Sequence, residues 1–318
     1  MNESPLVSIV INCYNGEEYV EAAINSLLTQ TYRNFEIVFL DNMSTDKTRD
    51  RVAEFSDERI KYFCVDDHVS LGVARNLALT KTSGEYIGFL DVDDLWHPEK
   101  LSEQIPFFED PTIGLVFSSV DKVNSKGEVI YTEKTDLNNR FTKVCFSRLF
   151  SDYNVVMSSS IVSKKALQFV GNNFDDLLVY AEEYDLFLRI CLFYDAIKVN
   201  KILTSYRVHR KQSTNSLFEK SILEEKYVLA KLSILSPTFV NDNRATLYRK
   251  RQRLAWEDFL NSVAHGDSKY ARKSLLPYVF SSPKYLAFFI LSFLGKEIII
   301  YLWDIKRRLG KNLEFDHK

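Results

Sequence analysis

Three carboxylates lie within four residues, at Asp91, Asp93 and Asp94, directly after an apolar run. Carboxylates this close repel one another unless a cation lies among them or one of them takes up a proton. Hard oxygen ligands of this kind suit Mg²⁺ or Mn²⁺, which keep some of their water and share the phosphates of a substrate. The alternative is a solvated acidic turn after a strand, but the motif favours a metal site for a phosphate-bearing substrate.

Polar residues that could bind a nucleotide occur at two further places. Arg75 follows Gly72 at the start of a predicted helix, where backbone N–H groups and a guanidinium could hold a diphosphate. Asp41 and Asn42 could hydrogen-bond a base or a ribose. Each has a simpler explanation when taken alone, because Arg75 could be an ion-pairing arginine and the turn from Asn42 to Asp46 could cap the next helix.

Short apolar runs alternate with helical patterns over the first third of the chain. Strands are predicted over 6–11, 35–40, 60–65 and 86–90, and helices over 17–29, 46–55 and 71–80. This rhythm predicts βαβ units in a mostly parallel sheet, in which ligands bind outside the carboxyl ends of the strands. The polar turns 12–16, 41–44 and 91–94 would therefore meet at one edge. The first turn has only Gly16 and no glycine-rich phosphate loop, so another group must neutralise a bound phosphate.

The composition is that of a globular protein. The chain has 318 residues, of which 46% are hydrophobic and 26% charged, which excludes disordered, collagen-like and coiled-coil classes and suggests one large domain or two. The formal charge of −2 divides unequally, because residues 222–318 carry +7 and the rest −9. The four cysteines form no CxxC pair, which argues against a zinc site and a disulfide framework, so a reducing, cytoplasmic location is expected.

From residue 222 onward the sequence is helical, basic and aromatic, and a domain boundary is predicted within 217–222. Basic clusters span 244–253 and 306–311, and apolar runs span 285–294 and 298–303. These runs are shorter than the roughly 20 residues that cross a bilayer. The segment 244–311 instead fits helices that lie on an anionic membrane, or helices that bury their apolar faces against the first domain or in a homodimer. Nucleic acid is disfavoured because no recognition motif is present.

Five ordered motifs resemble those of family 2 glycosyltransferases. They are Val7 to Asn15, Ser26 to Tyr32 with Asn34 to Val38, Asp41 to Asp46, Gly72 to Asn76, and Asp91 to Trp96. The resemblance is dense over residues 5–100, sparser to about 215 and absent afterwards. It implies an α/β GT-A fold, a Rossmann-like, mostly parallel sheet flanked by helices, with a C-terminal helical extension. Residues 1–221 would form a nucleotide-sugar-dependent catalytic domain that inverts the anomeric centre.

The resemblance also implies roles for individual residues. Those expected to line the nucleoside pocket are Asn12, Tyr14 and Asn42. Asp41 and Asp91 would reach the base or ribose, and Arg75 the base or diphosphate. Asp93, together with Asp91, would hold Mn²⁺ or Mg²⁺, which offsets the charge that builds on the departing nucleoside diphosphate. Asn42 stands where many relatives have Asp, which removes one acceptor for a pyrimidine N–H and leaves the donor nucleotide open.

An inverting transfer needs a base that takes the proton of the acceptor hydroxyl. The resemblance assigns it to Glu182-Glu183-Tyr184-Asp185, at the start of a helix predicted over 180–193, with Glu183 where relatives usually have Asp. Glu183 is the expected base, and Glu182 or Asp185 are the alternatives. Without the family, this run is an acidic first turn that complements the helix dipole. Arg207 and His209 could contact the diphosphate or the metal, although a lone His is as often structural.

These features predict a metal-dependent inverting glycosyltransferase that moves one sugar from a UDP-sugar to a glycan. By family analogy, the acceptor would be a lipid-diphosphate-linked intermediate of O-antigen, capsule or exopolysaccharide synthesis, at the cytoplasmic face of a bacterial inner membrane. A processive polymerase is disfavoured because Gln252 to Trp256 lacks the QxxRW spacing. Two other classes stay open: a phosphohydrolase with Asp91 as nucleophile and Asp93 as acid, and a non-catalytic nucleotide-sugar-binding scaffold.

Overall fold

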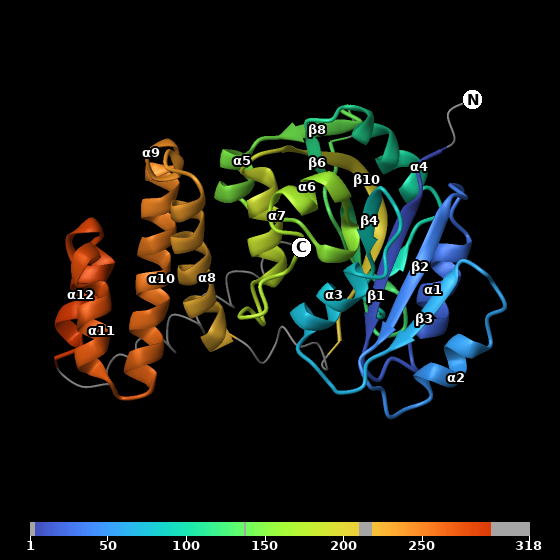
Figure 1. Cartoon of the computed structure of the whole chain (residues 1–318). Helices are drawn as coiled ribbons and strands as arrows, with labels where there is room; N and C mark the ends of the chain where they lie inside the picture. The colour runs from blue at the N-terminus through green and yellow to red at the C-terminus, as the bar shows by residue number, and fades with distance from the viewer. Residues whose placement is uncertain (1–3, 137, 210–217, 294–318) are drawn as a thin grey trace. The chain divides into compact units, whose positions relative to one another are not determined.

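The chain forms two compact units, Met1–Ser216 and Leu217–Lys318. The computed structural model describes residues 4–136, 138–209 and 218–293 of them. The boundary between the units lies at 216/217, beside the range 217–222 in which the sequence pattern predicts it. The first unit combines a sheet with helices, and the described part of the second is helical (Figure 1).

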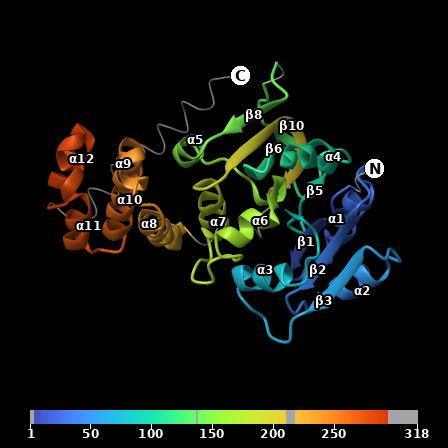
Figure 2. The ribbon, with the colours of Figure 1, turned by 45° about the horizontal axis from the view of Figure 1, so that its top comes forward.

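A mixed sheet forms the centre of the first unit, in the order β3-β2-β1-β4-β9-β6-β10-β5. Its strands are β1 Val7–Cys13, β2 Phe35–Asp41, β3 Ile60–Cys64, β4 Tyr86–Phe89, β5 Leu95–Trp96, β6 Ile113–Val123, β9 Ser160–Ser163 and β10 Asp195–Arg207, with β7 Val129–Thr132 beside β6 and β8 Phe141–Val144 beside β10. Strands β3, β2, β1 and β4 are parallel neighbours (Figures 1 and 2). The strand pattern of the first third of the chain is thereby confirmed.

Strand β9 departs from the parallel arrangement, because it pairs antiparallel with both β4 and β6. The 3₁₀ turn Met157–Ser159 comes just before it, and Ser158 Oγ accepts a hydrogen bond from the Asp91 N–H, just past the carboxyl end of β4. The chain therefore enters the sheet from that edge and runs back across it. Strand β10 is parallel to β6, so the carboxyl ends of β1, β2, β4, β6 and β10 share one edge.

Helices cover the two faces of this sheet. They are α1 Val20–Leu28, α2 Thr48–Ala53, α3 Leu71–Leu79, α4 Lys100–Gln104, α5 Phe146–Ser151, α6 Lys164–Phe169 and α7 Glu182–Cys191, with a 3₁₀ helix at Ile105–Glu109. Helix α1 connects β1 to β2, toward one edge of the sheet, whereas α3 connects β3 to β4, toward the other edge. Because both crossovers are right-handed, the two helices lie on opposite faces of the sheet (Figure 2). In α1, Val20, Ala23, Ile24 and Leu27 recur at helical spacing and are buried against the sheet.

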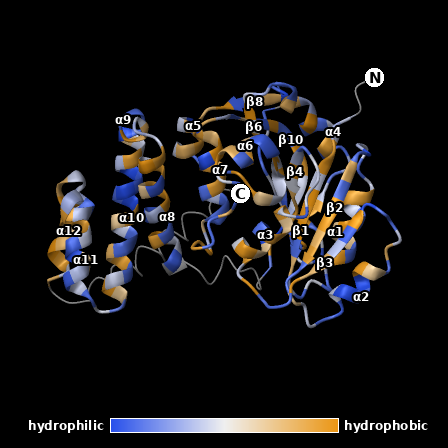
Figure 3. Cartoon of the chain, viewed as in Figure 1, coloured by the Kyte–Doolittle hydropathy of each residue, from blue (hydrophilic) through white to orange (hydrophobic). Residues whose placement is uncertain are grey.

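The second unit has a small core of its own. Its helices are α8 Phe218–Leu235, α9 Phe239–Asp242, α10 Arg244–Ala264, α11 Ser268–Leu275 and α12 Pro283–Leu291, with a 3₁₀ helix at Leu276–Ser281. Hydrophobic and hydrophilic residues alternate along α10 (Figure 3). The ring centre of Trp256 in this helix lies 5.2 Å from that of Tyr285 in α12. Part of the apolar run 285–294 thus packs inside the unit. No helix among the described residues is long and apolar enough to cross a membrane.

Candidate functional site

The acidic loop, residues 91–94 just after β4, lies at the edge of the sheet where the carboxyl ends of the strands meet. Each of its three carboxylates, those of Asp91, Asp93 and Asp94, contacts another part of the protein. Asp94 is 1% exposed and accepts a hydrogen bond from the Arg207 N–H at 2.8 Å. Burial, together with the charges of Asp93 and Asp91, raises the pKa of Asp94 well above its usual range. Asp93 Oδ2 lies 2.8 Å from His209 Nε2. Of the three crowded carboxyls, Asp94 is thus one whose ionisation is strongly disfavoured. His209 contacts the loop itself, whereas the sequence predicts a contact with the diphosphate or the metal.

Arg75 links this loop to α7. Its side chain is buried, and its two terminal nitrogens donate to different carboxylates, Nη1 to Glu182 Oε1 at 2.9 Å and Nη2 to Asp91 Oδ1 at 3.2 Å. From its sequence position Arg75 is expected to reach a base or diphosphate, whereas in the structure it bridges two acidic segments. A buried guanidinium needs such partners, because an unpaired buried charge is costly. Arg75 therefore positions the acidic loop against the helix that carries the expected base.

Glu183 follows Glu182 in the first turn of α7. Burial raises the pKa of Glu183 to about 8, the positive charge of Arg75 works against this rise, and the charges of Glu182 and Asp91 add to it. A carboxylate whose pKa lies near the working pH is suited to take a proton from a hydroxyl. The structure thus places the expected base within the electrostatic reach of the acidic loop.

Asp185 has a different environment from Glu183. It is fully buried, and its Oδ2 accepts from Arg189 Nε at 2.8 Å, one helical turn away. The Arg189 guanidinium also donates to the carbonyl oxygens of Val170 and Asn173. An acceptor hydroxyl cannot reach a carboxylate enclosed in this way, so the geometry makes Asp185 a positioning residue. Glu182 is likewise 4% exposed and paired with Arg75, which leaves Glu183 as the base that the geometry favours.

Arg207, the last residue of β10, also holds the acidic loop in place. Its Nε donates to the Asp93 carbonyl oxygen at 2.7 Å, and its Nη1 donates to the carbonyl oxygens of Asn124 and Ser125, each at 3.1 Å. The guanidinium also lies over the ring of Tyr19, 4.9 Å from its centre. Through these contacts Arg207 supports the backbone of the loop, whereas a contact with the diphosphate or the metal is expected from its sequence position.

At the expected nucleoside end, Asp41 and Asn42 direct their side chains to the protein. Asp41 accepts from the Tyr62 hydroxyl at 2.6 Å and from the Ser44 N–H at 2.7 Å. The Asn42 amide exchanges two hydrogen bonds with the backbone of Val69, at 2.8 and 3.0 Å. Both residues were expected to contact the base or ribose, but their polar atoms organise the loops of this edge.

Two other predicted residues at this end are better placed for a ligand. Tyr14 is 52% exposed, and its ring centre lies 4.3 Å from that of His68. Asn12 Nδ2 is buried and has no hydrogen-bond partner among the described residues, which is a donor that a ligand could satisfy. Met43, which follows Asn42, has a φ of 64°, a left-handed conformation that is rare for such a residue and typical of functional sites.

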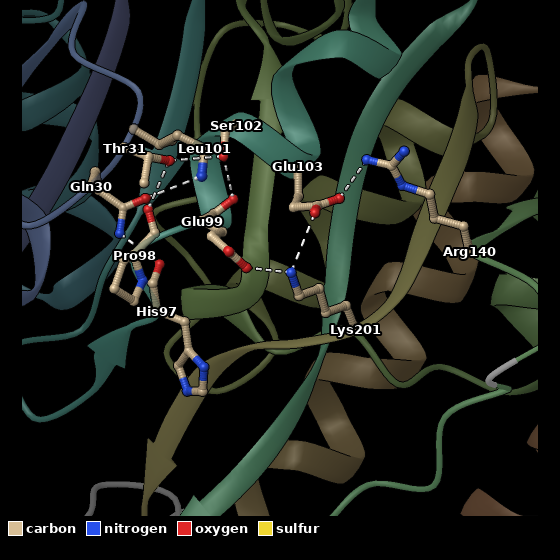
Figure 4. A network of polar contacts seen from close by, with 10 residues as sticks. All are labelled: Gln30, Thr31, His97, Pro98, Glu99, Leu101, Ser102, Glu103, Arg140 and Lys201. Atoms are coloured by element: carbon tan, nitrogen blue, oxygen red, sulfur yellow. Dashed lines mark hydrogen bonds and ion pairs between the residues drawn. The ribbon is translucent and has the colours of Figure 1, made fainter.

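A polar network supports the far end of the acidic loop (Figure 4). Gln30 is fully buried, its Nε2 donates to the His97 carbonyl oxygen at 2.7 Å, and its Oε1 accepts from the Leu101 N–H at 3.1 Å. The Thr31 N–H donates to the Pro98 carbonyl oxygen at 2.8 Å. Further out, Lys201 of β10 pairs with Glu99 and Glu103 of the same segment. Gln30 and Thr31, directly after α1, thereby hold residues 97–101, which follow the acidic loop.

Two residues that support the site, Gln30 and Ser158, are not predicted from the sequence. Gln30 continues the apolar face of α1, and an amide at such a position predicts a buried hydrogen-bond partner. Ser158 accepts from the Asp91 N–H, while its carbonyl oxygen accepts from Trp96 Nε1 at 2.7 Å, so it holds both ends of the loop. Nothing in the sequence around Ser158 indicates this role.

The residues of the loop fit a divalent ion that is shared with a substrate. Asp93 offers a carboxylate oxygen and His209 an imidazole nitrogen, 2.8 Å apart and partly exposed. Within the part of the chain that the structure describes, no group of three His, Cys, Asp or Glu side chains is arranged to hold a metal. A carboxylate oxygen such as that of Asp93 suits Mg²⁺ or Mn²⁺, because these ions complete their shell with phosphate oxygens and water.

Comparison with known proteins places this geometry among sugar-transferring enzymes. Residues 8–169 match the model of glycosyl transferase family 2. Two Escherichia coli proteins, WfgD and WfaP, are 31% and 32% identical to the chain; the matches cover 68% and 72% of this chain and 82% and 87% of those proteins. Both are named UDP-Glc:alpha-D-GlcNAc-diphosphoundecaprenol beta-1,3-glucosyltransferases.

Solved structures of the same fold extend over both units. S. aureus TarS 1-349 in complex with UDP-GlcNAc has a TM-score of 0.59 at 20% identity, covering 86% of each chain. The mannosyltransferase PcManGT from Pyrobaculum calidifontis, in complex with GDP-Man and Mn²⁺, has a TM-score of 0.61 at 18% identity, covering 95% of this chain and 88% of that one. The expected GT-A fold with C-terminal helices is confirmed.

Proposed function

Since the chain belongs to glycosyl transferase family 2, we propose that it moves one sugar from a nucleotide-sugar to a glycan acceptor with inversion of the anomeric centre. The observation that carries this proposal is the connection of Glu183 to the acidic loop. Arg75 joins Asp91 of that loop to Glu182, so a base with a raised pKa lies beside the place where a diphosphate would bind. An inverting displacement needs these two groups together.

In the proposed reaction, the Glu183 carboxylate takes the proton of the acceptor hydroxyl as its oxygen attacks the anomeric carbon. The new bond joins that oxygen to carbon, and the bond from the anomeric carbon to the diphosphate oxygen breaks. The electron pair leaves with the nucleoside diphosphate. Asp93 and His209 would hold Mn²⁺ or Mg²⁺, which supplies positive charge to the leaving diphosphate. Arg75 and Arg207 keep the loop and α7 in place while this happens.

We further propose a UDP-sugar as the donor and a lipid-diphosphate-linked glycan as the acceptor. Support comes from the two Escherichia coli relatives, whose names specify UDP-Glc and a diphosphoundecaprenol-linked acceptor. Such an acceptor would be presented at the cytoplasmic face of a bacterial inner membrane, and the protein would act there as one addition step in the assembly of a surface polysaccharide.

The second unit would bring the protein to that membrane. Its last described turns expose large apolar side chains, with Phe280 88%, Ile290 56% and Phe293 64% exposed. Apolar side chains beside basic residues such as Lys284 are typical of helices that lie in a membrane interface. Some of the predicted basic charge is neutralised within the unit, because Arg253 pairs with Glu225 and Glu257. The portion of the predicted segment 244–311 beyond Phe293 lies outside the described residues.

The test of the donor and the metal is nucleotide binding. Thermal shifts with UDP, GDP and dTDP, each with and without Mn²⁺, would be compared for the wild type, Asp93→Ala and His209→Ala. We expect stabilisation by UDP that needs both the ion and Asp93, and a weaker response for His209→Ala. An exposed carboxylate, Asp152→Ala, serves as the control. No stabilisation of the wild type by any nucleotide would refute the proposal.

A transfer assay separates the enzyme classes that the sequence leaves open. Wild-type protein, Mn²⁺, UDP-glucose and a lipid-diphosphate-linked GlcNAc acceptor are expected to yield UDP and an extended glycan. Release of inorganic phosphate from a phosphate ester, with no glycan product, would indicate the phosphohydrolase instead. Binding of the nucleotide-sugar without turnover over a panel of donors and acceptors would indicate the scaffold.

A further inference from the structure

The second unit contains a cavity of about 470 Å³ between α8, α10 and α11. This volume is typical of pockets that hold one small molecule. On α10 the cavity is lined by Arg251, Leu254, Ala255 and Asp258, whose positions i, i+3, i+4 and i+7 lie on one face of the helix. The residues that line the cavity all belong to the second unit, so it is distinct from the proposed nucleotide site of the first unit.

The charged residues of this cavity leave two positive charges without a negative partner. Lys226 Nζ lies 2.8 Å from Asp258 Oδ2, so these two lining residues form an ion pair. The other charged lining residues are Arg251 and Lys273, which are exposed. Neither side chain forms an ion pair or a hydrogen bond with a residue that the structure describes. Within the described part of the unit, the cavity thus has two cations available for an anionic ligand.

Arg251 and Lys273 lie about one helical turn apart along the cavity. Ser274 Oγ lies 3.5 Å from the Ala255 carbonyl oxygen, so this part of α11 runs beside Ala255. Lys273 directly precedes Ser274, and Arg251 comes one turn of α10, about 6 Å, before Ala255. Two long side chains can close this distance on a single ligand group. The buried side chain of Leu254 lines the cavity between them, so a ligand held by both cations also meets an apolar surface.

The side of the cavity near Tyr278 adjoins exposed apolar side chains. Burial raises the pKa of Tyr278, and the positive charge of Arg251 works against this rise, so the two lining residues are electrostatic neighbours. Leu276 and Phe280, two positions to either side of Tyr278, are 58% and 88% exposed. Basic residues beside exposed apolar side chains are typical of protein surfaces at a membrane interface. A membrane is therefore the source from which we expect the ligand to come.

We propose that this cavity binds the phosphate head of a membrane lipid, with Arg251 and Lys273 on the phosphate and the start of the lipid chain over Leu229 and Leu254. A guanidinium matches phosphate oxygens through parallel hydrogen bonds. A phosphate monoester carries a charge of about −1.5 to −2 near pH 7, which suits two cations better than the single charge of a diester. Phosphatidic acid should therefore bind better than phosphatidylglycerol. This inference goes beyond the proposed function, because the cavity takes no part in the sugar transfer.

The first test uses two soluble probes with the same head, hexyl phosphate and glycerol phosphate, in calorimetry on the full chain. We expect hexyl phosphate to bind about tenfold more tightly or better, because only it buries a hydrocarbon chain. Arg251→Gln combined with Lys273→Gln should weaken hexyl phosphate about a hundredfold. The matched control is Arg249→Gln combined with Lys269→Gln, which removes the same charge from exposed positions of the same two helices and should leave the affinity nearly unchanged.

A second variant fills the cavity and keeps its charges. Ala230 lines the cavity and is exposed, so Ala230→Phe adds a ring there without disturbing the core. We expect this variant to lose the preference for hexyl phosphate over glycerol phosphate. Melting temperatures without ligand, within about 1 °C of the wild type, would show that each variant is folded. UDP binding should stay at the wild-type level in all of them, so a failure of the proposed function would be seen separately.

Vesicles then test the membrane as the source of the ligand. We expect the wild type to sediment more with phosphatidylcholine vesicles that contain phosphatidic acid than with those that contain phosphatidylglycerol at equal total charge. Arg251→Gln with Lys273→Gln should abolish this difference. Equal affinity for the two soluble probes would indicate a site for free phosphate and overturn the inference. So would an equal loss of affinity in both double variants, no binding of hexyl phosphate, or no preference between the two kinds of vesicle.

Discussion

Glu183 and Asp185 lie two residues apart on α7, yet their carboxyl groups have different surroundings. Asp185 is enclosed and paired with Arg189, one turn further along the helix. Glu183 lies near Arg75 and the carboxylates of Glu182 and Asp91, and burial raises its pKa to about 8. Residues two positions apart point to different sides of a helix, so one first turn can hold both an ion pair and a base.

The raised pKa of Glu183 predicts how activity depends on pH. The base must be ionised, so we expect kcat/KM to rise about tenfold per pH unit below pH 8 and to level off above it. Glu183→Gln should lower kcat by about 10²- to 10⁴-fold while nucleotide affinity is kept. Initial rates between pH 5.5 and 9.5 would check both effects. Wild-type activity that does not change with pH over this range would contradict the role of Glu183.

The same shift predicts a change in stability. A carboxyl whose pKa is higher in the folded than in the unfolded chain stabilises the fold at low pH, and this stabilisation is lost as the pH rises from about 4.5 to about 8. Glutamine avoids the cost of that ionisation. Glu183→Gln should therefore melt above the wild type at pH 8.5, with a difference that disappears toward pH 5. An identical difference at both pH values would show that ionisation is not its cause.

Asp185 predicts a loss of stability instead of a loss of chemistry. Asp185→Asn leaves the buried guanidinium of Arg189 without its negative partner, which should cost about 3–5 kcal/mol in the free energy of unfolding. Urea denaturation would measure this cost, and the exposed Asp152→Asn should show almost none. At a temperature where it is folded, the variant should keep most of its transfer rate. A fully stable but inactive Asp185→Asn would instead identify Asp185 as the base.

At the scale of the elements, the geometry of the site depends on hydrogen bonds that other segments make to the acidic loop and to the chain after it. The end of α1 holds the chain after the acidic loop through Gln30, and the turn before β9 holds the loop itself through Ser158. Neither residue contacts a substrate group in the proposed mechanism. Both act by fixing backbone atoms, which is how a loop on a rigid sheet keeps catalytic carboxylates in place.

The support that Gln30 gives to the chain after the acidic loop can be measured with a single substitution. Gln30→Ala leaves the His97 carbonyl oxygen and the Leu101 N–H without their buried partner, which should cost about 1–3 kcal/mol of stability. The loosened loop should also weaken the metal-dependent part of nucleotide binding. Thermal melts with and without UDP and Mn²⁺ would measure both effects, and the exposed Gln168→Ala would be the control. Equal UDP and Mn²⁺ responses in Gln30→Ala and the wild type would remove Gln30 from the support of the site.

The sequence predicts the elements better than the contacts between them. Alternating apolar runs locate β1 to β4 and bring the three polar turns to one edge, because local periodicity and the parallel rule decide these features. Strand β9 follows Ser158, which contacts Asp91 across 67 residues of sequence. The partners Tyr62 of Asp41, Val69 of Asn42 and Glu182 of Arg75 lie 21, 27 and 107 residues away. Residue types alone could not show that these side chains face the protein.

At the scale of the whole molecule, the second unit has a small buried core, and its last described turns have exposed apolar side chains. Trp256 packs between Phe259 and Tyr285, with Lys284 Nζ 3.9 Å above its ring, so α12 is anchored to α10. Phe280 and Ile290 remain exposed outside this contact. An anchored helix with exposed apolar side chains is suited to lie on a lipid surface.

Membrane attachment through these side chains can be tested with vesicles. We expect the full chain to sediment with vesicles of anionic phospholipid and much less with neutral ones. Phe280→Ser combined with Ile290→Ser should lower the affinity for the vesicles by about a hundredfold or more, because full burial of such side chains contributes about 1.5–3 kcal/mol each. Serine at the exposed Val129 and Ile130 of the first unit is the control. Unchanged vesicle binding together with loss of a dimer in solution would assign this surface to a second copy of the chain.

The bridge made by Arg75 also has a consequence for the synthesis of the protein. Glu182 is 107 residues further along the chain than Arg75, so the ribosome completes the first four strands long before α7 exists. Contacts between such distant residues form late in folding, after the cost of closing the long loop has been met. Until Glu182 has been made, Asp91 is the acidic hydrogen-bond partner of Arg75 that the chain already contains. The acidic loop thus gains its final support only when the chain that carries the base has been made.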